Sequence, residues 1–163
     1  LIRFEDVDLN NIASCVDGQM EELMSAGKLS ELENSMVRRP IIYKFFESNL
    51  AVRMCEAAKK NKLYKEKQFL IGIPAHELYR DVEADDNILV RGIIDAFFIE
   101  DDHIVLMDYK TDATREISAD GLVKKYRAQL EQYKTLLNRM FDISVSETLI
   151  YSFSLGQELE VNV

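Results

Sequence analysis

The segment RGIIDAFFIEDDHIVLMDYKTD, residues 91–112, is the most informative part of this chain. It covers most of two runs rich in Ile, Val, Phe and Met, residues 88–100 and 103–111, which flank a short polar turn. Such a pattern predicts two antiparallel strands joined by a hairpin. One carboxylate interrupts each run, Asp95 in the first and Asp108 in the second. A carboxylate in a buried strand is costly unless it is paired, hydrogen-bonded or bound to a metal, so each aspartate needs a partner.

The position of the turn decides which residues of the two strands face each other. A turn centred on Asp101 and Asp102 places Asp95 opposite Asp108, because both lie equally far from it. Facing residues have Cβ atoms about 4.5–5.5 Å apart, so the two carboxylates would repel each other unless a cation lay between them. Oxygen ligands favour Mg²⁺ or Mn²⁺ over zinc. The hairpin therefore predicts a divalent-metal site.

Strand alternation adds an ammonium group to this site. Asp108 and Lys110 share one face of their strand, and Tyr109 points to the other. In the neighbouring strand, alternation gives one face to Ile93, Asp95 and Phe97. Two carboxylates and one ammonium are thus expected to converge above the sheet. The alternative is that Asp108 and Lys110 form an ordinary salt bridge at a sheet edge while Asp95 caps a turn.

Three further polar residues are candidates for the same site. Glu66 lies near the start of an expected strand at residues 63–73, where an exposed surface position is an equally good interpretation. Gln129 and Tyr133 are four residues apart on an expected helix at residues 118–140, so they share one helix face. A glutamine at the rim of the core beside a buried tyrosine explains that pair equally well.

The histidines and cysteines do not form a metal site in this interpretation. We expect His76 at a strand end and His103 at the hairpin turn to be exposed. Two cysteines, Cys15 and Cys55, are too few for an iron–sulfur cluster or a four-cysteine zinc site, and suit free thiols in a reducing compartment. The sequence contains no G-x-x-x-x-G-K-[ST] motif, so no ATP site is expected in it.

The pattern along the chain predicts one α/β domain, residues 1–163, with a helical part at 1–62 and a sheet-forming part at 63–163. In the helical part, Asp8, Ser30 and Asn49 are the expected helix caps; Glu33 completes a capping box with Ser30. Beyond the three strands and the helix already described, two more strands are expected at residues 147–155 and 157–163.

The charge balance excludes a protein that holds nucleic acid through its own basic surface. Twenty Lys and Arg stand against 29 Asp and Glu, which gives a net charge of −9. Hydrophobic residues make up 47% of the chain, with only six Gly and two Pro, as is typical of an ordered globular protein. No apolar run approaches the roughly 20 residues that span a bilayer, so we expect a soluble, cytoplasmic protein without membrane contact.

The polar motifs, taken in order, resemble a known nuclease family. Glu66, then GIID ending at Asp95, then DYKTD from Asp108, then QLEQY from Gln129 to Tyr133 are similar to the RecB-like branch of the PD-(D/E)XK nuclease superfamily. The stretches FFESNLAVRM, YKEKQFLIGIPA, RGIIDAFF, VLMDYKTD, YRAQLEQYKTLL and LIYSFSLGQELEV resemble the C-terminal nuclease domains of AddA subunits in bacterial AddAB helicase–nucleases. The resemblance implies a restriction-endonuclease-like fold with a central mixed sheet flanked by helices.

The resemblance also implies roles for the candidate residues. Asp95 and Asp108, with the main-chain carbonyl of Tyr109, would bind Mg²⁺ or Mn²⁺. Lys110 would position or activate the attacking water, and Glu66 would help to hold water at the metal. Gln129 and Tyr133 would support the site and contact the DNA strand.

The activity implied is that of a magnesium-dependent DNA exonuclease acting on single-stranded DNA, which a helicase supplies during double-strand-break repair and recombination. The implied partner is an AddB-like subunit. The family usually adds a metal-binding His from a helix ahead of the first strand, and no His precedes Glu66 here. The resemblance therefore implies a fragment of a longer chain that cleaves poorly or not at all alone. A catalytically silent docking module and a Cas4-like nuclease remain alternatives; the shortage of cysteines disfavours the latter.

Overall fold

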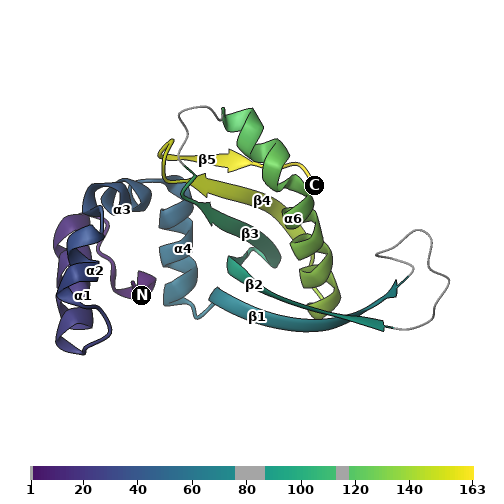
Figure 1. The fold of residues 1–163 in the computed structure, drawn as a ribbon, viewed down its shortest axis with the longest axis horizontal. Coiled ribbons are helices and arrows are strands. Elements are labelled where there is room, and N and C mark those ends of the chain that lie inside the picture. The colour runs from purple at the N-terminus through teal and green to yellow at the C-terminus, as the bar shows by residue number, and fades with distance from the viewer. Residues whose placement is uncertain (1, 76–86, 113–117) are drawn as a thin grey trace.

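The computed structural model describes residues 2–75, 87–112 and 118–163, and its centre is a mixed five-stranded sheet (Figure 1). The strands lie side by side in chain order, β1 to β5. Neighbours are antiparallel except β3 and β4, which are parallel and are connected through helix α6. The predicted α/β class, with a mixed sheet flanked by helices and a helical N-terminal part, is confirmed.

The elements, in chain order, are η1 (Phe4–Asp6), α1 (Ile12–Ser25), α2 (Glu31–Met36), α3 (Arg39–Phe46), α4 (Asn49–Lys59), β1 (Leu63–Pro74), β2 (Asn87–Glu100), β3 (His103–Lys110), α6 (Ala119–Met140), β4 (Val145–Ser152) and β5 (Gln157–Glu160). No helix in the described ranges is long and apolar enough to cross a membrane. Cys15 and Cys55 are free thiols, the first half-buried and the second buried.

The expected strands and the long helix are present, with corrections at their ends. The fourth strand begins earlier than expected and stops at Ser152, because residues 153–156 form the turn to the next strand. The backbone of Gly156 has a φ of 62° in that turn, a conformation that glycine adopts without strain. The fifth strand ends at Glu160, where its pairing with β4 ends.

Two of the three expected helix caps are wrong by a few residues, whereas the capping box of α2 is confirmed. The first helix begins after Asn11, because the Asp8 carboxylate accepts a hydrogen bond from the Asn10 amide (3.0 Å) in a turn that precedes the helix. Helix α4 is capped by Ser48 rather than Asn49, since the serine hydroxyl accepts a backbone amide of the first turn (3.2 Å).

The sheet separates two hydrophobic clusters. One face packs against α4, η1 and the other N-terminal helices through residues such as Phe46, Met54 and Phe98. The other face packs against α6 through residues such as Phe97 and Leu130. Because Phe97 and Phe98 are neighbours in β2, their membership of different clusters follows from strand alternation.

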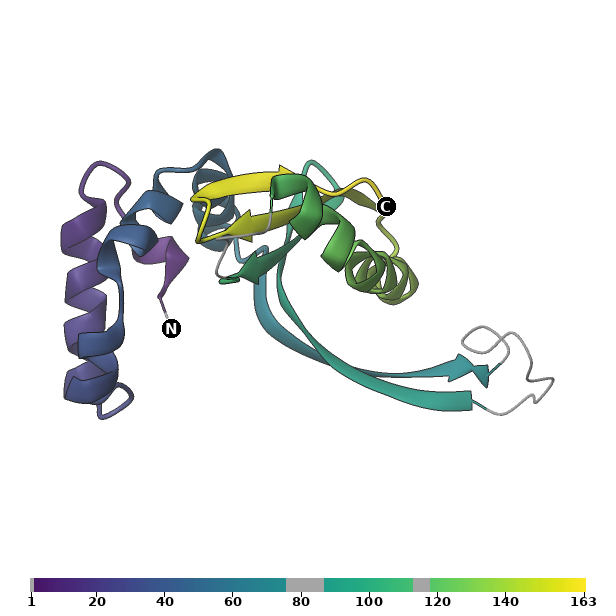
Figure 2. The same cartoon turned by 45° about the horizontal axis from the view of Figure 1, so that its top comes forward.

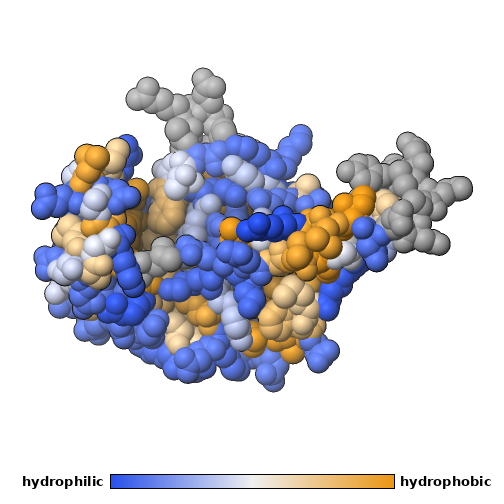
Figure 3. Space-filling view, turned by 60° about the horizontal axis from the view of Figure 1, so that its bottom comes forward, coloured by the Kyte–Doolittle hydropathy of each residue, from blue (hydrophilic) through white to orange (hydrophobic). Residues whose placement is uncertain are grey.

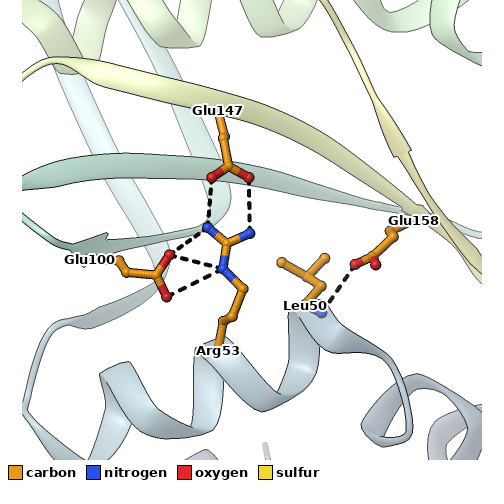
Figure 4. Close-up of polar contacts among 5 residues, drawn as sticks. All are labelled: Leu50, Arg53, Glu100, Glu147 and Glu158. Carbon is orange, nitrogen blue, oxygen red and sulfur yellow. Dashed lines mark hydrogen bonds and ion pairs between the residues drawn. The ribbon is translucent and has the colours of Figure 1, made fainter.

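A salt-bridge cluster joins α4 to the sheet (Figure 4). Both nitrogens at the end of the Arg53 guanidinium donate to Glu147 of β4, at 2.8 and 2.9 Å. The same guanidinium donates to Glu100 of β2, at 2.6 and 2.9 Å, and its carbon lies 5.4 Å from the centre of the Phe98 ring. These hydrogen bonds hold the pKa of Glu147 below its usual value. We call Arg53, Glu100 and Glu147 the α4 clamp.

Strands β1 and β2 extend beyond the rest of the sheet. They pair with each other from Leu63 and Phe98 to Pro74 and Asn87, with one break at Glu66 and Asp95. Strand β3 pairs with β2 only as far as Ala96. The outer parts of β1 and β2 therefore form a two-stranded ribbon, which curves away from the sheet below α6 (Figure 2).

Candidate active site

Asp95 and Asp108 lie at the point where β2 and β3 separate, which we call the strand fork. The last pair of the two strands is Ala96 with Met107, in the register that the sequence predicts. Asp95 and Asp108 are the next residues on each strand. The two carboxyl groups are close enough for the charge of Asp95 to contribute to a raised pKa of Asp108. The predicted proximity of the two aspartates is therefore present in the fold.

The Asp95 side chain replaces part of the strand pairing at the fork. Its carboxylate accepts a hydrogen bond from the main-chain amide of Tyr109 at 3.0 Å. Ile94 and Phe97 both belong to the cluster under α6, although strict alternation would separate them. The strand thus changes face between them, and the expectation that Ile93, Asp95 and Phe97 share a face is wrong. The physical reason is the break in pairing at this point, where β2 leaves β3 and its pairing with β1 skips Glu66 and Asp95.

Among the residues that the structure describes, Asp108 is the one buried residue with a charged side chain. It is 3% exposed, and its ion-pair partner is the Lys110 ammonium. Burial raises the pKa of Asp108; the Lys110 charge opposes this shift, and the Asp95 charge adds to it. The net effect is a raised pKa, because the penalty of burying the charged form exceeds the stabilisation that the Lys110 ammonium gives it.

The Lys110 ammonium is held from the α6 side. It donates a hydrogen bond to Gln129 at 3.2 Å, and Gln129 donates in turn to the Tyr133 hydroxyl at 3.1 Å. Its nitrogen lies 4.0 Å from the centre of the Tyr126 ring. Tyr109 points to the opposite face, as predicted, and its ring packs against the Phe45 ring. Lys110 and the predicted pair on α6 therefore form one hydrogen-bonded chain, and Lys110 connects it to Asp108 through their ion pair.

Glu66 lies on the other side of Asp95. It occupies the position between two β1–β2 pairs, opposite Asp95, with a φ of 50° that is unusual for a residue other than glycine. Its side chain is exposed. Glu66, Asp95 and Tyr109 line one hollow of about 250 Å³, which η1 closes through Phe4. The structure therefore brings Glu66 beside Asp95, but into this hollow rather than toward Lys110.

Tyr126 and Asp112 also belong to this network, although the sequence motifs alone gave them no role. The Tyr126 hydroxyl donates to the Asp112 carboxylate at 2.7 Å, and the Lys125 ammonium donates to the same carboxylate at 2.5 Å. These contacts hold the pKa of Asp112 below its usual value. The available signals were the second aspartate of DYKTD and the position of Tyr126 one helical turn before Gln129.

The donors at the strand fork fit a hard divalent cation in type. Two carboxylates, Asp95 and Asp108, are adjacent, and the pKa of the buried one is raised. Across residues 2–75, 87–112 and 118–163, no three His, Cys, Asp or Glu side chains gather as metal ligands, so protein carboxylates supply only part of a coordination shell. His103 is exposed at the start of β3, as predicted, and His76 lies outside the described residues.

The chain is similar to three bacterial proteins that are named as the A subunits of ATP-dependent helicase/nucleases. It is 34% identical to that of Lachnoclostridium phytofermentans over 87% of this chain, and 34% identical to that of Clostridium perfringens strain 13 over 96%. It is 33% identical to that of Clostridioides difficile strain 630 over 94%. In each case the match covers 13% of the relative's own length. The predicted similarity to AddA subunits, which carry this name, is confirmed.

A family-level comparison covers the part of the chain that contains the candidate site. A sequence model of the PD-(D/E)XK nuclease superfamily matches residues 10–156, which include all the predicted site residues and every strand except β5. The match covers most of the chain and includes residues of both the helical part and the sheet. The chain therefore belongs to the PD-(D/E)XK nuclease superfamily.

Proposed function

We propose that this chain is a metal-dependent exonuclease domain that hydrolyses phosphodiester bonds of single-stranded DNA. The observation that carries the proposal is the arrangement at the strand fork. Asp95 and Asp108 are adjacent, and within the described residues Lys110 is the cation in contact with Asp108. Two negative charges and one positive charge leave an excess negative charge next to the core. A divalent cation is the ligand that this excess favours.

Each residue has a distinct task in the proposed reaction. Asp95, Asp108 and the Tyr109 carbonyl hold Mg²⁺ or Mn²⁺, which when bound polarises the scissile phosphate and stabilises charge during displacement. Lys110 orients the attacking water and stabilises negative charge as it develops. Gln129 fixes the Lys110 ammonium, because its side-chain oxygen accepts from that nitrogen.

The two outer candidates support this centre from opposite sides. Tyr133 holds Gln129 in position through its hydroxyl, so it acts on Lys110 indirectly. Glu66 is exposed in the hollow beside Asp95, where its carboxylate holds water on the side of the fork away from α6.

The proposed substrate and partner follow from the relatives. Their name combines a helicase with a nuclease, and we propose that a helicase supplies single-stranded DNA to this domain in double-strand-break repair and recombination. An acidic domain with a net charge of −9 suits such delivery, because it does not need to attract DNA by itself. We further propose that the partner is an AddB-like subunit and that the compartment is the cytoplasm.

The test is cleavage of an end-labelled single-stranded oligonucleotide by the natural full-length protein with its partner subunit. Titration with Mg²⁺ or Mn²⁺ should activate cleavage, and Asp108→Ala should abolish it. Asp142→Ala is the matched control, because Asp142 is an exposed aspartate in the loop between α6 and β4. Cleavage that is equal in parent and Asp108→Ala would show that the domain is a silent docking module.

A further inference from the structure

A groove runs between the β1–β2 ribbon and helix α6. It has a volume of about 360 Å³, within the range of ligand-binding pockets. Its floor is formed by ribbon residues Phe69, Ile71 and Val90, and its wall by Tyr133 and Leu136 of α6. The lining of the groove is largely apolar, and the groove is open to solvent. Exposed apolar side chains elsewhere on the ribbon form the hydrophobic surface that Figure 3 shows along it.

The Phe69 ring on the groove floor occupies space that is free because the residue beneath it is a glycine. Phe69 pairs with Gly92 across the ribbon, and its ring lies directly over that glycine. A Cβ atom at position 92 would come within 2.3 Å of the ring, so no larger residue fits beneath it. The ring is only partly buried, and it meets the Tyr133 ring edge-on at a centroid distance of 5.9 Å. Two aromatic rings therefore border the groove.

The groove is continuous with the candidate active site. Tyr133 borders it and also accepts the hydrogen bond of Gln129, which contacts Lys110. Lys67 lies between the strand fork and Phe69, and alternation places it on the same ribbon face as Phe69. Within the described part of the chain, the Lys67 ammonium has no ion-pair or hydrogen-bond partner. An unpaired lysine thus lies along the ribbon between the groove and the strand fork.

We infer that this groove binds the bases of single-stranded nucleic acid next to the phosphate at the strand fork. Phe69 supplies the stacking face, Tyr133 borders the base on the α6 side, and Lys67 contacts a backbone phosphate. Stacking tolerates every base sequence, because every base has a π-face. It also gives an acidic domain a means of holding a strand that does not depend on a basic surface. The inference rests on the proposed function for its ligand class.

The experiment is photo-cross-linking with single-stranded DNA that carries 5-iodouracil, followed by peptide mass mapping. The natural full-length protein is irradiated without divalent cations, so that the strand is not cut. Nucleotide adducts are expected on the peptides that contain Phe69 or Tyr133. Phe69→Leu should lower the adduct yield at Tyr133 by about tenfold, the effect of losing the stacking of one base. Phe69→Tyr should retain the yield, because the ring remains.

Leu70 provides the matched control on the same strand. It is 64% exposed and lies on the opposite face of the ribbon, so Leu70→Ala should leave the adduct yield unchanged. Absence of adducts at both peptides, or equal yields in Phe69→Leu and the parent, overturns the groove assignment. Adducts in a protein whose cleavage is insensitive to Asp108→Ala support the groove and overturn the proposed nuclease function. Cleavage that is lost in Asp108→Ala but occurs without adducts supports the nuclease function and overturns the groove assignment. The two failures are therefore distinguishable.

Discussion

The α4 clamp and the strand fork contain the same charges but differ in environment. Each has two carboxylates and one cation, and each cation lies over an aromatic ring, Arg53 over Phe98 and Lys110 over Tyr126. In the clamp, a forked guanidinium hydrogen-bonds both carboxylates and lowers the pKa of Glu147.

At the strand fork, burial raises the pKa of Asp108 by more than the Lys110 ammonium lowers it, so the pKa is raised. The clamp is complete without any added ligand, whereas the strand fork favours one more positive charge. Charge counting alone therefore does not distinguish a structural cluster from a metal site; solvation and hydrogen-bond geometry do.

The largest expected effect separates the two clusters by activity. Asp108→Asn should lower cleavage by at least about 100-fold, since a metal ligand supplies several kcal/mol of transition-state stabilisation. Glu147→Gln removes a carboxylate of the same kind from the clamp and should leave cleavage per folded molecule within about twofold. Initial rates at saturating Mg²⁺ are the measurement. Equal losses in the two variants would show that the clusters do not differ in function.

The second prediction separates them by stability. Arg53→Met leaves Glu100 and Glu147 facing each other without their cation and should lower the free energy of unfolding by about 1–2 kcal/mol. Asp108→Asn should not destabilise the metal-free protein, because the raised pKa means that the fold prefers an uncharged group there. Thermal or urea unfolding of the natural protein checks both; a destabilised Asp108→Asn would contradict the comparison.

The third prediction concerns Tyr126, the aromatic residue whose ring lies beneath the Lys110 ammonium. Tyr126→Leu removes the face on which the Lys110 ammonium lies and should lower kcat by about fivefold, in line with a contact of about 1 kcal/mol. Tyr126→Phe keeps the ring and loses only the hydrogen bond to Asp112, so it should retain most of the activity. KM should change little in either variant. A large KM effect would place Tyr126 in substrate binding instead.

The smallest effect is the pH dependence of the clamp. A carboxylate with a lowered pKa in the folded state contributes stability above its unfolded-state pKa, and this contribution is lost as pH falls through the folded-state value. Glu147→Gln should therefore reduce the loss of stability below about pH 4.5, by less than about 1 kcal/mol because Glu147 is partly exposed. Unfolding midpoints measured between pH 3 and 7 test this. An unchanged acid limb would show that Arg53 contributes no net stability through Glu147.

Much of the fold could be predicted because the apolar periodicity is strong. The hairpin around Asp101 and Asp102 has the expected register, since two residues with positive φ, 45° and 60°, fix a two-residue turn. Helix starts were less accurate at Asp8 and Asn49. Asp, Ser and Asn close together all accept backbone amides, so composition alone does not determine which of them caps the helix.

The candidate site was predictable where it depends on register and less so where it depends on tertiary packing. Placing Asp95 beside Asp108 required only the hairpin. The change of face at Asp95 depends on β3 ending its pairing at the fork, which leaves no local signal in β2. Spacing places Tyr126 one helical turn before Gln129, but its contact with the Lys110 ammonium depends on how α6 packs over that residue.

The ribbon has a mechanical consequence for the site beside it. Inward from Ala96, strand β2 is braced by a neighbour on each side, and outward from that residue only by β1. A force on the outer part of the ribbon therefore bends it most readily at the first position where β2 has only β1 as a neighbour. At that position Glu66 lies opposite Asp95. The joint that would yield under such a load is also the one that sets the spacing between the two aspartates.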